Sequence, residues 1–378
     1  MMNDEKYRKH IDTMFGTKDV ESFTEEEVDE TLDNLLQCIP NDGKLYKYRK
    51  ISDEKSFNYV YNSLLAGTLW LSRVDQFSDK TDCTVCYDPV NEVGRIENLL
   101  REKPELLLGG LMRALSKDVQ IINPNFDRSM LLRMVDCFDK ESGKPDAEKA
   151  LNIFTDYGCD IYDSVAAIGQ VWKCVKKVIS DKEDIIKDMV NNFLNFNQYV
   201  RKTAFVCSLC ESYNVKTMWE NYTDNNGICI EYDFKKLKLM PCTIKKFFCS
   251  LYKVNYVDDY EEVSFVPLIE AFLNCKSDKN TNAELNKKIL ISQITKTNDY
   301  AYEKEWRTFH FNLCDNGPGT EMKADLVSGI IFDENALKTE NGKKILALAK
   351  QKNLEIKIRK LNITSTKYQY LPLNQYMG

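Results

Sequence analysis

At 378 residues and 43% hydrophobic side chains, the chain is long enough for one large domain or two ordinary domains with a buried core. Its 52 basic and 58 acidic residues give a formal net charge of −6, which excludes a general electrostatic attraction to nucleic acid or to an anionic membrane. His10 and His310 are the only histidines, so multi-histidine metal sites and Ser-His-Asp triads are excluded as well.

The cysteines and the chain start bear on the cellular compartment. Thirteen cysteines, an odd number, are scattered singly through apolar stretches, a pattern typical of reduced thiols and not of a small disulfide scaffold. No apolar run approaches the roughly 20 residues of a membrane helix, and the N-terminus MMNDEKYRKHIDTMFG lacks the apolar core of a secretory signal. We expect a cytoplasmic protein.

Residues 1–43 predict an N-terminal helical arm. Thr24 and Glu27 have the spacing of a capping box, which marks a helix start. The apolar residues that follow fall on one helical stripe: Val28, Leu32, Leu35, Leu36 and Ile39. The turn Pro40-Asn41-Asp42-Gly43 then separates this arm from the next segment.

The remainder alternates strand-like runs with helical stripes, which predicts an α+β core with a mixed, twisted sheet. We expect Gly67 and Gly227 at turns, because each separates two different patterns. Helices are predicted over SFNYVYNSLLA and NGKKILALAKQKN. The predicted strands are 44–51, 68–74, 204–210, 226–233, 247–257, 301–311, 328–333 and 354–361.

Long helical periodicities between residues 93 and 200 predict a helical insertion. They occupy the runs RIENLLREKPELLLGGLMRAL, SMLLRMVDCF, SVAAIGQVWKCVKKVI and DIIKDMVNNFLNFNQYV. The core domain would then comprise 44–92 and 201–378, with a further helical pair at 261–297. We expect the insertion 93–200 to offer a surface for a partner.

The segment DYAYEKEWRTFHF, residues 299–311, places several charges among strand-forming residues. If 301–311 is one strand, Glu303, Glu305 and Arg307 share a face, because side chains alternate. Two carboxylates side by side suit chemistry at a sugar carbon, where positive charge develops on the ring. The alternative is a solvated strand end with a salt bridge to Arg307.

A second candidate region is residues 204–234, where a strand leads into a short helix and then a turn before another strand. Ser208 lies near the end of the first strand, a common location for site residues. Trp219 and Tyr222 have helical spacing, and for Trp219 we favour a place in the core.

Five motifs in this order resemble the bacterial domain of unknown function 2971. They are LYKYRKI, TLWLSRVDQFSDKTDC, FVCSLCE with MWENYTDNNGICIEYDF, VNYVDDY and YEKEWRTF. The resemblance spans about 45–312 and implies an α+β core found in bacterial and phage-associated proteins. The family usually has Phe-Asn-Asp-Pro where this chain has Phe77-Ser78-Asp79-Lys80.

The same motif order looks like the ADP-ribosyltransferase superfamily, which holds NAD in a split sheet. The matching residues are Arg49, Ser72 and the pair Glu303 and Glu305 in Glu-Lys-Glu. The resemblance implies that Arg49 anchors the NAD phosphates and that Ser72 positions the ribose. It also implies that Glu305 stabilises the ribosyl cation while Glu303 activates the acceptor.

Tyr48 and Ser208 complete the expected NAD-binding set, with NAD as substrate and no metal. The implied context is a bacterial toxin or phage-defence effector that modifies a protein or nucleic-acid acceptor. A Glu305→Gln substitution is expected to remove most of the turnover with little change in stability.

Other readings stay open. Cys83/Cys86 and Cys207/Cys210 have Cys-x-x-Cys spacing, although free buried thiols fit an extended run better than a zinc site. Acidic residues are numerous enough for a metal-dependent nuclease: Asp79, Asp82, Asp258, Asp259, Glu261 and Glu262. A non-catalytic sensor or interaction protein on the same fold is the other alternative.

Overall fold

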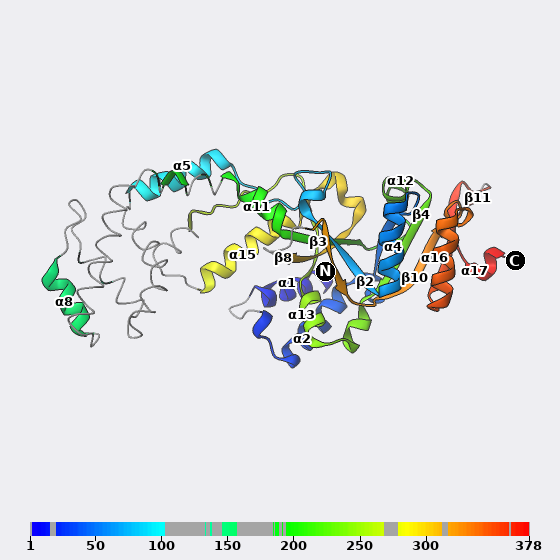
Figure 1. Ribbon diagram of the computed structural model, residues 1–378, viewed down its shortest axis with the longest axis horizontal. Helices are drawn as coiled ribbons and strands as arrows, with labels where there is room; N and C mark the ends of the chain where they lie inside the picture. The colour runs from blue at the N-terminus through cyan, green and yellow to red at the C-terminus, as the bar shows by residue number, and fades with distance from the viewer. Residues whose placement is uncertain are drawn as a thin grey trace. The chain divides into compact units, whose positions relative to one another are not determined.

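The computed structural model divides the chain into two compact units (Figure 1). Unit 1 comprises Met1–Thr84, Gln198–Tyr260 and Leu290–Gly378, and unit 2 comprises Val85–Asn197 and Glu261–Ile289. The structure describes residues 2–15, 20–102, 146–156, 194–267, 279–311, 317–362 and 364–377, with positions 133, 137, 184, 186–188 and 191.

The N-terminal segment folds as two helices of unit 1, α1 (Met2–Met14) and α2 (Glu25–Cys38). Both hydrogen bonds of the predicted capping box at Thr24 and Glu27 are present, so the helix start is confirmed. The predicted apolar stripe faces inward, and its residues Val28, Leu32 and Leu35 belong to the main hydrophobic core. A short helix, α3 (Pro40–Gly43), leads into the first strand.

Unit 1 is built on a mixed sheet, which confirms the α+β prediction. Its order is β12-β11-β10-β4-β1-β3-β2-β9 along the main path, with β8 and β5 attached beside β3. Among the strands of this sheet that the structure describes, only β10 and β11 pair in parallel. The strands, in the described part of the chain, are β1 (Lys44–Lys50), β2 (Thr68–Arg73), β3 (Ala204–Cys210), β4 (Gly227–Asp233), β5 (Leu251–Lys253), β8 (Glu305–Phe311), β9 (Gly319–Lys323), β10 (Val327–Asp333), β11 (Glu355–Asn362) and β12 (Lys367–Pro372).

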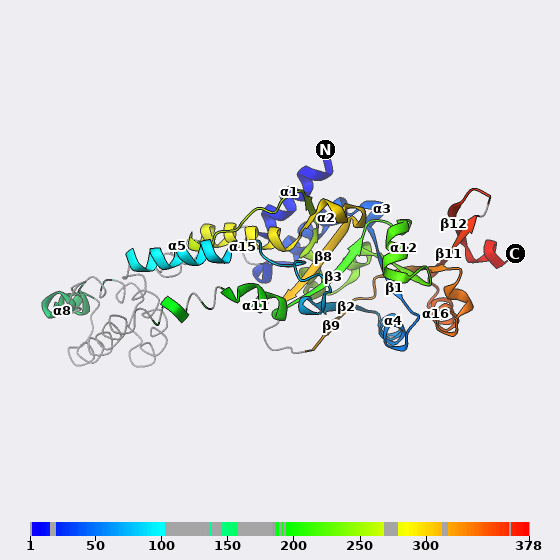
Figure 2. The same ribbon diagram turned by 90° about the horizontal axis from the view of Figure 1, so that it is seen from above.

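Helices cover both faces of this sheet. In β1, Leu45 joins the main core on one face, while Tyr46 and Tyr48 join a second cluster around Trp219 on the other. Figure 2 shows α4 and α16 on the side of the sheet opposite α12. The main helices of unit 1 are, besides α1 to α3, α4 (Glu54–Ala66), α12 (Lys216–Thr223), α13 (Cys242–Cys249), α16 (Glu340–Gln351) and α17 (Leu373–Met377), with 3-10 turns η1 (Val20–Ser22), η2 (Val74–Gln76), η3 (Phe234–Leu239), η4 (Asn298–Glu303) and η5 (Ala336–Lys338).

Trp219 is fully buried, as expected for a core residue. Gly67 ends α4 in the left-handed conformation (φ +66°), which confirms the predicted turn. The turn near Gly227 is made instead by Asp224 and Asn225 at positive φ, and Gly227 is the first residue of β4. A Cβ at Gly227 would lie 2.4 Å from the Arg49 carbonyl oxygen, so this glycine permits close strand approach.

Two predicted strands are wrong in part. The run 247–257 contains the end of α13, then β5, then β6 (Asn255–Val257). The run 301–311 begins as the 3-10 turn η4, and its strand β8 starts only at Glu305. Strands β7 (Thr295–Thr297), β9 and β12 were not predicted.

Unit 2 contains α5 (Pro89–Glu102) and α8 (Ala147–Asp156), while α11 (Phe196–Thr203) and α15 (Lys279–Gln293) run across the unit boundaries along the chain. The buried Glu92 carboxylate accepts bonds from the backbone nitrogens of Phe265 and Val266, which ties the segment after residue 260 to α5. The predicted insertion was 93–200. Most of its predicted helical runs lie outside the described residues.

No helix within the described ranges combines the length and the apolar character needed to cross a bilayer.

Candidate active site

The sheet splits beside β3. One edge of β3 pairs with β8 along its whole length. The other edge is shared, because β1 pairs with it only through Tyr46 and Cys210, while β2 pairs through Ser72 and Arg73. Between these contacts the Lys47 ammonium donates a hydrogen bond to the Ser208 carbonyl oxygen at 2.9 Å. A side chain thus provides a hydrogen-bond partner for the backbone where β1 and β2 diverge.

A cavity of about 350 Å³ opens at this split. Its walls come from β1, β2, β3, α12 and the segments around residues 77–82 and 296–305. All six residues predicted for the site line it: Tyr48, Arg49, Ser72, Ser208, Glu303 and Glu305. The expected convergence is therefore observed, although Tyr48 and Glu305 are 257 positions apart, and the chemical roles of these residues stay predictions.

The two glutamates do not share a strand face. Glu303 is the last residue of η4, and Lys304 adopts a left-handed conformation (φ +43°) before β8 begins at Glu305. The alternation rule therefore does not apply across residue 304. Glu305 and Arg307 do share a face of β8, and Glu303 reaches the same cavity from the preceding turn.

Lys296, which the sequence reading did not select, joins the two glutamates. Its ammonium lies 2.7 Å from Glu303 Oε2, 2.8 Å from Glu305 Oε2 and 3.6 Å from Asp82 Oδ2. The Tyr222 hydroxyl donates to the other oxygen of Glu303 at 2.7 Å, while its ring stays half exposed. One lysine thus holds three carboxylates around one point of the cavity wall.

Arg307 stands behind this cluster and is completely buried. It binds Glu305 in bidentate fashion, with Nε 2.8 Å from Oε1 and Nη2 3.0 Å from Oε2. Its Nη2 also lies 2.8 Å from Asp82 Oδ1. These two groups form an ion pair, but their geometry is not that of a hydrogen bond. Three carboxylates face two cations in this group, and Lys47, Arg49 and Asp79 also line the cavity.

The charged states follow from these contacts. Burial by itself would raise the pKa of Glu305, but Arg307 and Lys296 outweigh it and hold that pKa well below its usual range. Burial would lower the pKa of Lys296, but the surrounding carboxylates, Glu305 foremost, raise it instead. Both groups therefore remain ionised at neutral pH.

The expectation that Glu305→Gln leaves stability unchanged is not supported by this geometry. A glutamine amide cannot accept two hydrogen bonds from Arg307 as a carboxylate does, and it leaves a buried cation partly unpaired. Glu303 accepts from Tyr222 and Lys296 only, and neither bond requires a bidentate carboxylate. Glu303→Gln is therefore the gentler change.

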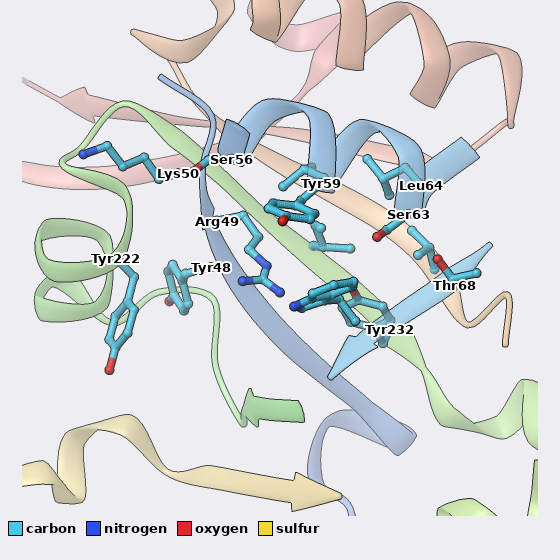
Figure 3. Close-up of a pocket in the computed structure, with 14 residues that line it drawn as sticks. Tyr48, Arg49, Lys50, Ser56, Tyr59, Ser63, Leu64, Thr68, Tyr222 and Tyr232 are labelled. Carbon is cyan, nitrogen blue, oxygen red and sulfur yellow. The ribbon is translucent and has the colours of Figure 1, made fainter. Parts of the chain in front are cut away.

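Arg49 has the opposite character. Its side chain is half-buried and lines the cavity, yet no acceptor within the described residues bonds its guanidinium. A planar guanidinium with five free donors is suited to a phosphate or carboxylate. Figure 3 shows Arg49 projecting from β1, with Tyr48 on one side and Tyr59 on the other.

The loop after β2 closes another wall of the cavity and is held by a buried arginine. The Arg201 guanidinium donates to the carbonyl oxygens of Val74, Asp79, Lys80 and Asp82. These bonds fix the loop that contains Phe77-Ser78-Asp79-Lys80. Phe77, Ser78, Asp79 and Asp82 thereby contribute to the lining.

The cysteines of the two Cys-x-x-Cys pairs make separate contacts. Cys207 lies 3.1 Å from the Lys47 ammonium, and Cys210 contacts the carbonyl oxygens of Tyr46 and Ser212. Cys83 lies 3.0 Å from Arg307 Nη1. No group of three or more histidine, cysteine or acidic side chains in the described ranges is placed to hold a metal ion.

Residues 218–308 match the family model described as Protein of unknown function (DUF2971). This match confirms the predicted DUF2971 relationship for residues 218–308, while the rest of the predicted span of about 45–312 lies outside the match. The DUF2971 segment contains Tyr222, Lys296, Glu303, Glu305 and Arg307, and so the whole charged cluster except Asp82.

Arg49, Ser72 and Ser208 lie outside the DUF2971 segment, and they reach the same cavity only through the fold. No curated protein and no solved structure matched the chain. The resemblance to ADP-ribosyltransferases is not shown by these comparisons.

Proposed function

We propose that the protein binds NAD in the split-sheet cavity and cleaves the bond between nicotinamide and ribose. The bonding electrons leave with nicotinamide, and C1′ of the ribose forms a new bond to water or to a nucleophile of a protein or nucleic-acid acceptor. The acceptor's proton passes to a carboxylate. The observation that carries the proposal is that Arg49, which bonds no acceptor among the described residues, lines one cavity with the glutamates Glu303 and Glu305.

The charge distribution supports this reaction. The Glu303 and Glu305 carboxylates line the cavity, where they could stabilise a cationic nicotinamide ring and the cation-like ribose that forms as the bond breaks. Arg49 is free to bind the pyrophosphate. In this scheme Glu305 stabilises the ribosyl cation, Glu303 activates the acceptor, and Ser72, Ser208 and Tyr48 orient the sugar.

One observation favours a second candidate, a non-catalytic nucleotide sensor on the same fold. Glu305 accepts three hydrogen bonds or ion pairs from Arg307 and Lys296, so most of its acceptor positions are already occupied. In a sensor the cluster would only shape the cavity, and Arg49 would bind the ligand. Binding without turnover distinguishes the two.

The test is nicotinamide release from NAD by the purified protein, in metal-free and in Mg²⁺-containing buffer, with cell lysate added as a source of acceptor. Glu303→Gln and Glu305→Gln are each expected to lower the rate by about 100-fold, since each removes a charge that the transition state needs. Glu340→Gln on the exposed end of α16 is the matched control and should retain full activity.

Melting temperature is recorded for every variant, so that a loss of rate can be separated from a loss of fold. Millimolar NAD should raise the melting temperature of the wild type, because a ligand that binds the folded state stabilises it. Absence of both nicotinamide release and this stabilisation would overturn the proposal.

A further inference from the structure

Figure 3 shows the residues that line a second cavity, whose volume is about 220 Å³. Tyr48, Arg49 and Tyr222 line both, so the two cavities share a wall that contains the unpaired guanidinium. The remaining walls of the second cavity come from α4, β2, β4 and the start of β10. The combined volume falls in the range of about 300–1,000 Å³ typical of small-molecule sites.

The second cavity differs from the first in charge. Its described lining contains no carboxylate, and its two cations are Arg49 and Lys50. Lys50 is already paired with Asp224 at the surface. Across the two cavities the lining therefore changes from the carboxylates Glu303 and Glu305 with their partner Lys296, through the Arg49 guanidinium, to the uncharged residues of α4, β2 and β4.

The neutral end is aromatic. Tyr59 of α4 and Trp70 of β2 have ring centroids 5.1 Å apart at an interplanar angle of 38°, and Tyr232 of β4 joins the same lining. The Trp70 ring lies over β9, where a Cβ at Gly319 would come within 2.2 Å of it. A side chain at position 319 would displace the Trp70 ring, so glycine at this position lets the ring line the cavity.

A buried hydroxyl in this cavity has no partner. Thr68 is 9% exposed, and no group in the described residues hydrogen-bonds its Oγ1. A buried polar group left unsatisfied costs about 1–3 kcal/mol, so such groups are rare without a bound molecule or water. Thr68 lines the cavity that contains Tyr59 and Trp70, where its hydroxyl could donate to or accept from a nucleobase edge.

We infer that this second cavity holds the adenosine part of the substrate, with adenine against Tyr59 and Trp70 and near Thr68. Arg49 then binds the pyrophosphate between the two cavities. This assignment rests on the proposed function for the identity of the substrate. The order of charges matches NAD, in which a cationic ring, two phosphates and a neutral purine follow one another.

The experiment measures binding of three probes by calorimetry: adenosine monophosphate, ADP-ribose and nicotinamide mononucleotide. Tyr59→Leu should weaken adenosine monophosphate and ADP-ribose at least 10-fold, because it removes a stacking surface, and should leave nicotinamide mononucleotide unchanged. Tyr59 is 40% exposed, so the variant is expected to fold. Tyr199→Leu, also at an exposed tyrosine but outside both cavities, is the matched control.

Thr68→Val gives an independent readout. It removes only the hydroxyl, so it should weaken the two adenosine probes several-fold while folding stability stays unchanged or rises. Adenosine monophosphate that binds wild type, Tyr59→Leu and Thr68→Val equally, or that binds none of them, would overturn the assignment.

The outcomes also separate this inference from the proposed function. Tyrosine-dependent binding of adenosine monophosphate without any NAD cleavage would contradict the reaction and retain the adenosine site. NAD cleavage whose KM is the same in wild type and Tyr59→Leu would contradict the adenosine site and retain the reaction.

Discussion

Arg307 and Arg49 lie in the same split sheet but differ in burial and in hydrogen bonding. Arg307 is fully buried and bonded to Glu305, Asp82, Cys83 and the Gln293 carbonyl oxygen. Arg49 is half-buried and without an acceptor among the described residues. A buried guanidinium whose donors are bonded to protein groups helps to hold the fold together. A guanidinium beside a cavity whose donors are free can bind a ligand.

The largest expected effect comes from breaking the architectural arginine. Arg307→Met leaves Glu305 and Asp82 with less compensating charge in a buried setting, and should lower the free energy of unfolding by about 3–5 kcal/mol. Urea denaturation measures this change. The exposed pair of Lys343 and Glu340 supplies the control, because Lys343→Met should cost less than about 1 kcal/mol. Equal costs for the two variants would contradict a structural role for Arg307.

Measuring the free energy of unfolding against pH sharpens the comparison. The contribution of the cluster around Lys296 and Arg307 should persist in mild acid. The pKa of Glu305 is lowered, so its contribution is complete above the unfolded value of about 4.5 and is lost only at lower pH. Loss of stability at higher pH must therefore come from another group.

His10 is that group. It is 1% exposed, and burial lowers its pKa from 6.5 to about 4, while the Cys249 carbonyl opposes the shift without forming an aligned hydrogen bond. The unfolded state thus binds more protons between these values, so stability should fall by up to about 3 kcal/mol as pH drops from 6.5 to 4. In His10→Phe the unfolding free energy should fall much less between pH 6.5 and 4.5 than in wild type, and a slope equal to wild type would exclude His10.

The two glutamate-to-glutamine changes divide the cluster itself. Glu305→Gln should cost about 1–3 kcal/mol of folding stability, because it weakens the bidentate contact to Arg307. Glu303→Gln should cost less, since a glutamine oxygen can still accept from Tyr222 or Lys296. Thermal unfolding of both variants checks the order, and a larger loss for Glu303→Gln would contradict it.

Much of the fold could be predicted because its signals are local. The capping box at Thr24, the glycine after α4 and the alternation in β1 each depend on neighbouring residues. Failures occurred where a local pattern was interrupted, as at Lys304, whose left-handed backbone separates Glu303 from β8. No residue type near position 304 signals that break.

The candidate site was predicted less completely, for a physical reason. Arg49, Ser72 and the glutamates were selected by motif order, but their partners come from elsewhere in the chain. Lys296 lies in the polar run TKTNDY, and nothing in that run marks a lysine that gathers three carboxylates. The second cavity depends on α4 and β2 meeting beside Arg49, which only the folded chain brings about.

The smallest expected effect on stability belongs to Arg49. Arg49→Met removes a guanidinium that bonds no described residue, while the methionine keeps most of the apolar stem, so the free energy of unfolding should change by less than about 0.5 kcal/mol. Binding should respond strongly, because hydrogen bonds from a guanidinium to phosphate are charge-assisted. Titration with ADP-ribose should show at least a 10-fold loss of affinity, and Arg49→Lys should recover only part of it, since an ammonium cannot bind in bidentate fashion. A strongly destabilised Arg49→Met would mean that this arginine, like Arg307, serves the fold.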